Sequence, residues 1–122
     1  GLEPDVAFRE VLEERVRYMC LNQRLVRIFF EEEAELPPQL TKKLRRRQRE
    51  YEDVYVALLE AGVKKGKFQL STTPRIALYA LLGAVNWSYR WYNPEGSLSV
   101  EKLASDIAEM LMRGIERTRA KK

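Results

Sequence analysis

The sequence STTPRIALYALLGAVNWSYRWYNP, residues 71–94, decides the fold of this chain. Thr73 and Pro74 are the residue types preferred at the cap and the first position of a helix, and Pro94 requires the helix to have ended before it. A helix on the surface of a monomer normally has a single apolar stripe. Here the apolar residues cover nearly the whole circumference: Ile76, Ala77, Leu78, Ala80, Leu81, Leu82, Ala84 and Val85. The sequence therefore predicts a helix that is covered on more than one side.

Helix start and stop signals predict four more helices. The first begins at Pro4 and runs to about Cys20, and a short one follows from Asn22. The longest begins at Pro37-Pro38 and ends near Gly66, and the last begins after Ser99. The chain shows no alternating strand pattern, no repeat and no low-complexity linker. We expect an all-α fold in which five helices form one domain over residues 1–122.

The last helix also carries apolar residues on more than one side. Leu103, Ile107 and Leu111 lie on its main face, whereas Met110 lies outside it. A chain of 122 residues cannot easily bury two such helices by itself, so a homodimer is the economical interpretation. The predicted dimer contacts are Leu78, Leu81, Val85, Leu103, Ile107, Met110 and Leu111. The alternative is a central core helix wrapped by the other four.

A polar strip interrupts the apolar surface of the fourth helix. Its members, Tyr79, Gly83, Asn86 and Arg90, recur at helical spacing, and Trp87 and Trp91 flank them. Gly83 removes a side chain from the middle of the strip and opens space there. A groove with aromatic walls and a few directed polar groups is typical of a small-molecule site. The alternative is that the strip faces solvent and Arg90 pairs with an acid.

The long helix carries a basic run that invites a nucleic-acid interpretation. The run consists of Lys42, Lys43, Arg45, Arg46, Arg47 and Arg49. With about 100° per residue, most of it lies opposite the apolar face that contains Leu44 and Tyr55, which favours a solvated surface. Arg47 projects from within the apolar face and therefore predicts an acidic partner or an anionic ligand. A nucleic-acid-binding protein that uses this run is the competing hypothesis.

The composition argues against an enzyme. The chain has no histidine, which removes the commonest general base and metal ligand. Its single cysteine, Cys20, lies in an apolar stripe, where it predicts a packed thiol in a reducing cytoplasm. The apolar run at 76–85 is shorter than the roughly 20 residues that span a membrane. We expect no catalytic set, no cofactor, no metal site and no membrane contact.

Residues 81–94, followed by Gly96, Leu98 and Ser99, resemble the C-terminal domain of TetR-family transcriptional repressors. The resemblance is strongest to the branch associated with the degradation of fatty acids, steroids and other acyl-coenzyme A compounds. The segments 35–38 and 58–62, with Gly66 and Phe68, fit the same pattern. Together these segments place the resemblance over about residues 22–115.

The resemblance implies an effector-binding and dimerisation domain of a homodimer. The last two helices would pack with their mates as an intermolecular four-helix bundle. An effector, expected to be an acyl-coenzyme A thioester, would bind among the preceding helices and release the operator. DNA would be contacted only through an N-terminal helix-turn-helix domain that is absent from these 122 residues.

The expected effector site combines the polar strip with aromatic and basic residues of other helices. The tail of the effector would contact aromatic rings, and Arg90 or Arg47 would meet its polar or anionic groups. The expected site residues are Tyr18, Phe29, Phe30, Arg47, Tyr55, Tyr79, Gly83, Asn86, Trp87, Arg90 and Trp91. A helical dimeric module that binds other proteins, without a small-molecule ligand, is the alternative function.

Overall fold

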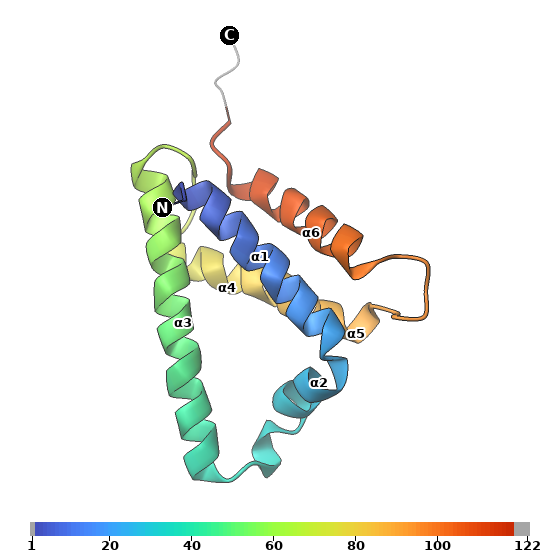
Figure 1. Cartoon of the computed structure of the whole chain (residues 1–122). Coiled ribbons are helices and arrows are strands. Elements are labelled where there is room, and N and C mark those ends of the chain that lie inside the picture. The colour runs from blue at the N-terminus through green and yellow to red at the C-terminus, as the bar shows by residue number, and fades with distance from the viewer. Residues whose placement is uncertain (1, 119–122) are drawn as a thin grey trace.

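The computed structural model of this chain describes residues 2–118, and helices joined by short loops make up most of it (Figure 1). The elements in chain order are α1 (Pro4–Leu21), α2 (Gln23–Glu31), the 3-10 turn η1 (Glu33–Glu35), α3 (Pro38–Lys64), α4 (Pro74–Asn86), α5 (Ser88–Trp91) and α6 (Val100–Ile115). Over residues 2–118 the extended structure is limited to one isolated antiparallel bridge, between Phe68 and Glu116. The all-α fold predicted from the sequence is confirmed.

Helix α1 lies at the centre of the fold, with α3 on one side of it and α6 on the other (Figure 1). Its predicted apolar stripe is buried, and Phe8, Leu12 and Val16 have no exposed surface. These side chains join one core cluster with Leu59 of α3 and Leu78 of α4. Because α1 contacts α3, α4, α5 and α6, it holds the domain together.

The predicted helix caps are confirmed. The Thr73 hydroxyl accepts a hydrogen bond from the Ile76 backbone N–H at 3.2 Å, at the start of α4. The Ser99 hydroxyl accepts one from the Lys102 backbone N–H at 3.1 Å, at the start of α6. Each cap satisfies a backbone donor that has no partner within its helix, so each helix starts where the sequence places it.

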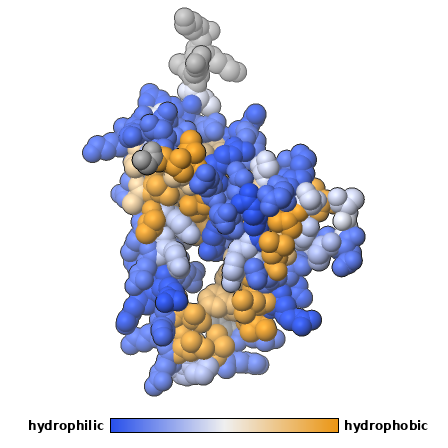
Figure 2. Space-filling view, in the orientation of Figure 1, coloured by the Kyte–Doolittle hydropathy of each residue, from blue (hydrophilic) through white to orange (hydrophobic). Residues whose placement is uncertain are grey.

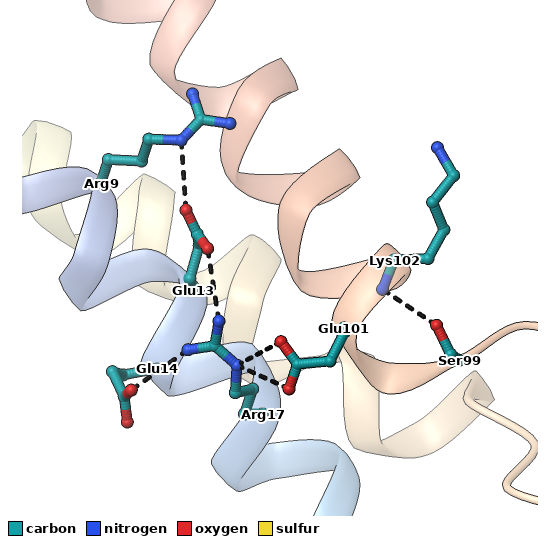
Figure 3. Close-up of polar contacts among 7 residues, drawn as sticks. All are labelled: Arg9, Glu13, Glu14, Arg17, Ser99, Glu101 and Lys102. Atoms are coloured by element: carbon teal, nitrogen blue, oxygen red, sulfur yellow. Dashed lines mark hydrogen bonds and ion pairs between the residues drawn. The ribbon is translucent and has the colours of Figure 1, made fainter.

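Ion pairs connect α1 to α6, and Figure 3 shows the one between Arg17 and Glu101. The Arg17 Nε donates to both carboxylate oxygens of Glu101 at 3.0 Å, and Arg9 Nη1 donates to Glu109 at 2.7 Å. Hydrogen bonds from Arg113 and Arg9 lower the pKa of Glu109. Such partly exposed pairs contribute little stability one by one, so their main effect is to orient α6 on α1.

The helix expected to continue up to Pro94 is interrupted at Trp87, which separates α4 from α5. The hydroxyl of Ser88 is fully buried and donates to the Val85 carbonyl at 2.7 Å. A serine hydroxyl that bonds back to the preceding turn bends a helix, which accounts for the break. Cys20 lies 3.8 Å from the same hydroxyl, and burial raises the pKa of its thiol. The cysteine is therefore a packing residue, as the sequence predicted.

Helix α3 packs well only near its C-terminal end. Its buried residues are Leu59 and Gly62, whereas Leu40, Tyr51 and Val54 are exposed. The chain reverses after α3 at Gly66, which has a positive φ of 76° that glycine adopts readily. The N-terminal half of α3 therefore stands away from the core, with α2 and η1 facing it (Figure 1).

Candidate functional site

A cavity of about 430 Å³, the main cavity, lies between α1, α2 and the N-terminal half of α3. Figure 2 shows the molecule hollowed between these elements, with apolar side chains gathered below the hollow. Most of its wall is apolar, and α2 contributes Phe29 and Phe30, whose rings meet edge to face at 5.3 Å. The volume falls within the range of roughly 300–1,000 Å³ that is typical of small-molecule sites.

Helix α2, which forms one wall of the main cavity, is held in place by hydrogen bonds at both of its ends. The Gln23 side chain, at the start of α2, donates to the Tyr89 carbonyl at 2.9 Å and to the Tyr92 carbonyl at 2.7 Å. The Tyr89 hydroxyl donates to Glu31, at the end of α2, at 3.0 Å, and burial raises the pKa of Tyr89. Both ends of α2 are therefore tied to α5 and the segment after it.

Several expected site residues come together around the main cavity. Tyr18 of α1, Phe29 and Phe30 of α2, and Arg47 and Tyr55 of α3 all line it. They are far apart in the sequence and meet because α1 and α3 diverge from one another and α2 lies across the open end between them (Figure 1). Their helices thus supply the aromatic walls and one basic group of the site expected from the sequence.

The polar strip does not line the main cavity. Tyr79, Gly83 and Arg90 are exposed, as are Trp87 and Trp91, because the opposite side of α4 packs into the core. Arg90 lies over the Trp87 ring, 4.4 Å from its centroid. The role of these residues in effector binding therefore stays a prediction.

Two hydrogen bonds nevertheless connect the strip to the cavity wall. Tyr79 donates through its hydroxyl to Glu52 at 3.1 Å, and Asn86 accepts from Arg15 at 2.8 Å. Glu52 and Arg15 both line the main cavity. The polar strip therefore contacts two residues of the cavity wall without lining the cavity itself.

Arg15 is the cavity residue that the sequence did not single out. It lies on α1, among other charged residues, where the pattern indicates an ordinary solvated side chain. In the structure its Nη2 donates to Asn86, whereas its Nε is buried and has no hydrogen-bond partner. Only the packing of α3 and α4 around α1 half-buries this side chain and covers its Nε.

A second cavity, the side cavity, has a volume of about 680 Å³ and lies between α1 and α3. It shares four lining residues with the main cavity: Arg15, Tyr18, Tyr51 and Tyr55. Its α1 wall adds the two carboxylates of Glu10 and Glu14. The two cavities therefore adjoin at Arg15 and the three tyrosines.

The family model described as "Tetracyclin repressor-like, C-terminal domain" matches residues 1–115. The chain is a TetR-family C-terminal domain. It is 30% identical, over 66 residues, to the HTH-type transcriptional repressor KstR2 of Rhodococcus jostii (strain RHA1). This match covers 54% of the chain and 32% of that relative, so the chain spans about a third of the curated protein it matches.

Solved structures of this family share the fold. One is a transcriptional regulator of the TetR/AcrR family from Thermobifida fusca YX-ER1, with 32% identity, a TM-score of 0.83 and coverage of 96% of this chain and 61% of that one. Another is AibR in complex with isovaleryl coenzyme A and operator DNA, with 21% identity, a TM-score of 0.78 and coverage of 92% and 60%. At that lower identity the AibR likeness shows the fold alone.

Some of the predicted dimer residues are buried inside the single TetR-family domain, and others are at its surface. Leu78, Leu81, Val85 and Leu103 are buried in the core of the single chain, because α4 and α6 turn these residues toward α1. Met110 is 67% exposed, and Ile107 and Leu111 are half-buried. The exposed apolar face of α4 consists of Ile76, Ala80, Gly83 and Ala84, and Trp87 follows directly after the helix. A partner chain could therefore reach these residues of α4 and Met110 of α6, but not the four core residues.

The described residues also bear on metal binding and on membrane-spanning segments. Among residues 2–118 no group of three or more histidine, cysteine, aspartate or glutamate side chains could hold a metal ion. None of the helices in that range is long and apolar enough to cross a membrane.

Proposed function

We propose that this TetR-family domain binds a small hydrophobic effector, an acyl-coenzyme A thioester, in the main cavity. The observation that carries the proposal is the cavity itself, whose aromatic and aliphatic walls enclose only a few polar groups. The complex of AibR with isovaleryl coenzyme A supports this class of ligand, because its fold is shared. The thioester's acyl chain would lie against Phe29, Phe30 and Leu44, in place of water.

In the whole regulator, effector binding would release operator DNA. We assign DNA contact to a helix-turn-helix domain outside these 122 residues, in keeping with the HTH-type repressor to which the chain is similar. The effector domain would then alter the spacing of two such DNA-binding domains, one on each protomer of a homodimer. The basic run of α3 would be a solvated surface rather than an operator-binding element.

Thermal unfolding with a panel of acyl-coenzyme A thioesters of different chain length tests the ligand class. A thioester present at a hundred times its dissociation constant stabilises the folded domain by about 2.7 kcal/mol, so the melting temperature rises by several degrees. Free coenzyme A, which lacks the acyl chain, is expected to give no such shift. The absence of a shift with every thioester would remove this ligand class.

Two tryptophan variants show whether the ligand occupies the main cavity. Leu44→Trp fills the space that Leu44 lines and is expected to abolish the shift. Ala57→Trp adds the same side chain at an exposed position of α3 that lines neither cavity, and it keeps the shift. A normal shift in Leu44→Trp would place the ligand elsewhere.

The homodimer is proposed to form through the exposed apolar face of α4 together with Met110 of α6. Gly83 supports this proposal. An exposed glycine inside a helix costs about 1 kcal/mol relative to alanine, yet a Cβ at Gly83 would meet nothing within 4 Å in the chain. A partner helix that packs closely against this face accounts for a glycine that the single chain does not require.

Ala84→Glu is expected to convert the dimer to a monomer, because it places a charge in the middle of the proposed interface. Sedimentation velocity measures the change in mass directly. The matched control is Ser105→Glu, an exposed position of α6 that does not neighbour Met110, and it is expected to remain dimeric. A wild-type monomer, or an Ala84→Glu dimer as tight as wild type, would contradict this interface.

A further inference from the structure

Arg15 occupies the place where the main cavity adjoins the side cavity. Its guanidinium reaches this position from α1, and its Nη2 is anchored by the Asn86 side-chain oxygen at 2.8 Å. Asn86 is the last residue of α4, so two different helices determine where the guanidinium lies. A long side chain held in this way has lost much of its rotamer freedom before any ligand arrives.

The polar atoms of Arg15 are incompletely satisfied within the chain. Its Nε is buried and has no hydrogen-bond partner, although a guanidinium offers five N–H donors. An unsatisfied buried donor is unfavourable, more so when it belongs to a charged group. The Nη1 also has no hydrogen-bond partner among the described residues, and unlike the Nε it is not buried, so a ligand oxygen in the cavity can accept from it.

The charge of Arg15 is also unbalanced. Its anchor, Asn86, is neutral, and none of the ion pairs between the described residues involves Arg15. The nearby carboxylates have other partners: Glu14 pairs with Arg17 at 3.1 Å, and Glu52 accepts from Tyr79 and lies 3.8 Å from Arg75. The adjoining Glu10 is exposed to solvent. The junction of the two cavities therefore presents the unpaired positive group of Arg15, whereas Arg47 lines the main cavity away from this junction.

The surroundings of Arg15 limit the shape of a matching ligand. On one side the main cavity offers an apolar space of about 430 Å³. On the other, the side cavity is lined by tyrosines and carboxylates together with the apolar Ala7, Val11 and Leu58. A molecule that fits both has an apolar body, an oxygen atom at the junction and a polar continuation without negative charge close to Glu10 and Glu14. An acyl group with its carbonyl oxygen at Arg15 and a neutral polar group beyond it, as in a thioester, meets these requirements.

We infer that Arg15 binds the acyl oxygen of the effector and that Asn86 is its positioning residue. This inference rests on the proposed function, since it assigns the polar contact within the same cavity. Arginine donates to carboxylate and carbonyl oxygens through a planar fork, and such charge-assisted bonds are stronger than neutral ones. The acyl chain then extends into the main cavity toward Phe29 and Phe30.

Isothermal titration calorimetry with three probes tests the contact. Octanoyl-coenzyme A carries the thioester oxygen, S-octyl-coenzyme A is the thioether that lacks it, and octanoate is the free acid. Wild-type protein is expected to bind the thioether roughly 10- to 100-fold more weakly than the thioester, because one charge-assisted hydrogen bond is lost. If octanoyl-coenzyme A binds more tightly than octanoate, the site is a thioester-binding site. If octanoate binds more tightly, the site binds carboxylates.

The variants separate the contact from general damage to the fold. In Arg15→Met the thioester and the thioether are expected to bind with equal affinity, whereas Arg24→Met, an exposed arginine of α2 outside both cavities, keeps the wild-type ratio. Asn86→Asp retains the shape of Asn86 but places a negative charge beside the Arg15 guanidinium, which balances its positive charge. Octanoyl-coenzyme A and octanoate are therefore both expected to bind roughly tenfold or more weakly, while the melting temperature is not lowered.

Two results would overturn the inference in different ways. If wild type binds octanoyl-coenzyme A and Arg15→Met retains the full preference for the thioester over the thioether, Arg15 does not bind the acyl oxygen, and the proposed function stands. If wild type binds none of the three probes, the inference falls together with the acyl ligand proposed for the cavity.

Discussion

Replacement of Phe8 by alanine is expected to lower the free energy of unfolding by about 3 to 5 kcal/mol. Phe8 is fully buried at the N-terminal end of α1, and its ring meets that of Phe68 edge to face at 6.0 Å. Removing the ring forfeits its hydrophobic transfer energy and leaves a cavity that α1 cannot close, since α3 and α6 contact α1 on either side. Urea denaturation followed by far-ultraviolet circular dichroism measures the change.

The control for Phe8 is Val6→Ala, at a position on the same helix that is 46% exposed. A surface substitution of this kind changes stability by about 0.5 kcal/mol or less. Both variants have to be compared with wild type at one protein concentration, because the stability of the proposed dimer would depend on concentration. A loss below about 1 kcal/mol for Phe8→Ala would contradict the central position of α1 in the core.

Gly62→Ala is expected to destabilise the domain by about 1 to 3 kcal/mol, although alanine is the better helix former. A Cβ at Gly62 would overlap the Phe68 ring, which is buried against α3 and cannot move without disturbing Phe8. The Gly62 carbonyl also accepts from the Lys67 and Phe68 backbone N–H groups, at 2.8 and 3.2 Å, which ties the turn after α3 to this position. Overpacking therefore outweighs the gain in helix propensity.

Gly114→Ala is the matched control, and both variants are measured in the Ala84→Glu background, expected to be monomeric, because Gly114 lies one helical turn from Met110. It makes the same chemical change in α6 where a Cβ meets nothing within 4 Å of the chain. Without a clash the helix propensity of alanine is expected to dominate, with a gain of roughly 0.5 to 1 kcal/mol. Chemical denaturation of the two variants should thus give changes of opposite sign. Equal stabilisation by both substitutions would show that Phe68 does not pack against Gly62.

Several residues that line the main cavity, the proposed effector site, could be predicted from the sequence. Tyr18, Phe29, Phe30, Arg47 and Tyr55 were predicted and line the main cavity. The polar strip does not line that cavity, and its role in effector binding stays a prediction, because residue spacing defines a face of one helix without showing which neighbour that face meets. For the same reason, dimer contacts were expected at Leu78 and Val85, which the chain buries in its own core.

The sequence by itself determined the helices and the residues that begin them. Thr73, Pro74 and Ser99 act within one turn of the chain, so their effect does not depend on distant packing. Only the tertiary structure decided which charged residue of α1 enters the cavity. Arg15 is half-buried because α3, α4 and α1 meet around it, and whether a side chain is solvated or covered depends on neighbours supplied by segments far away in the sequence.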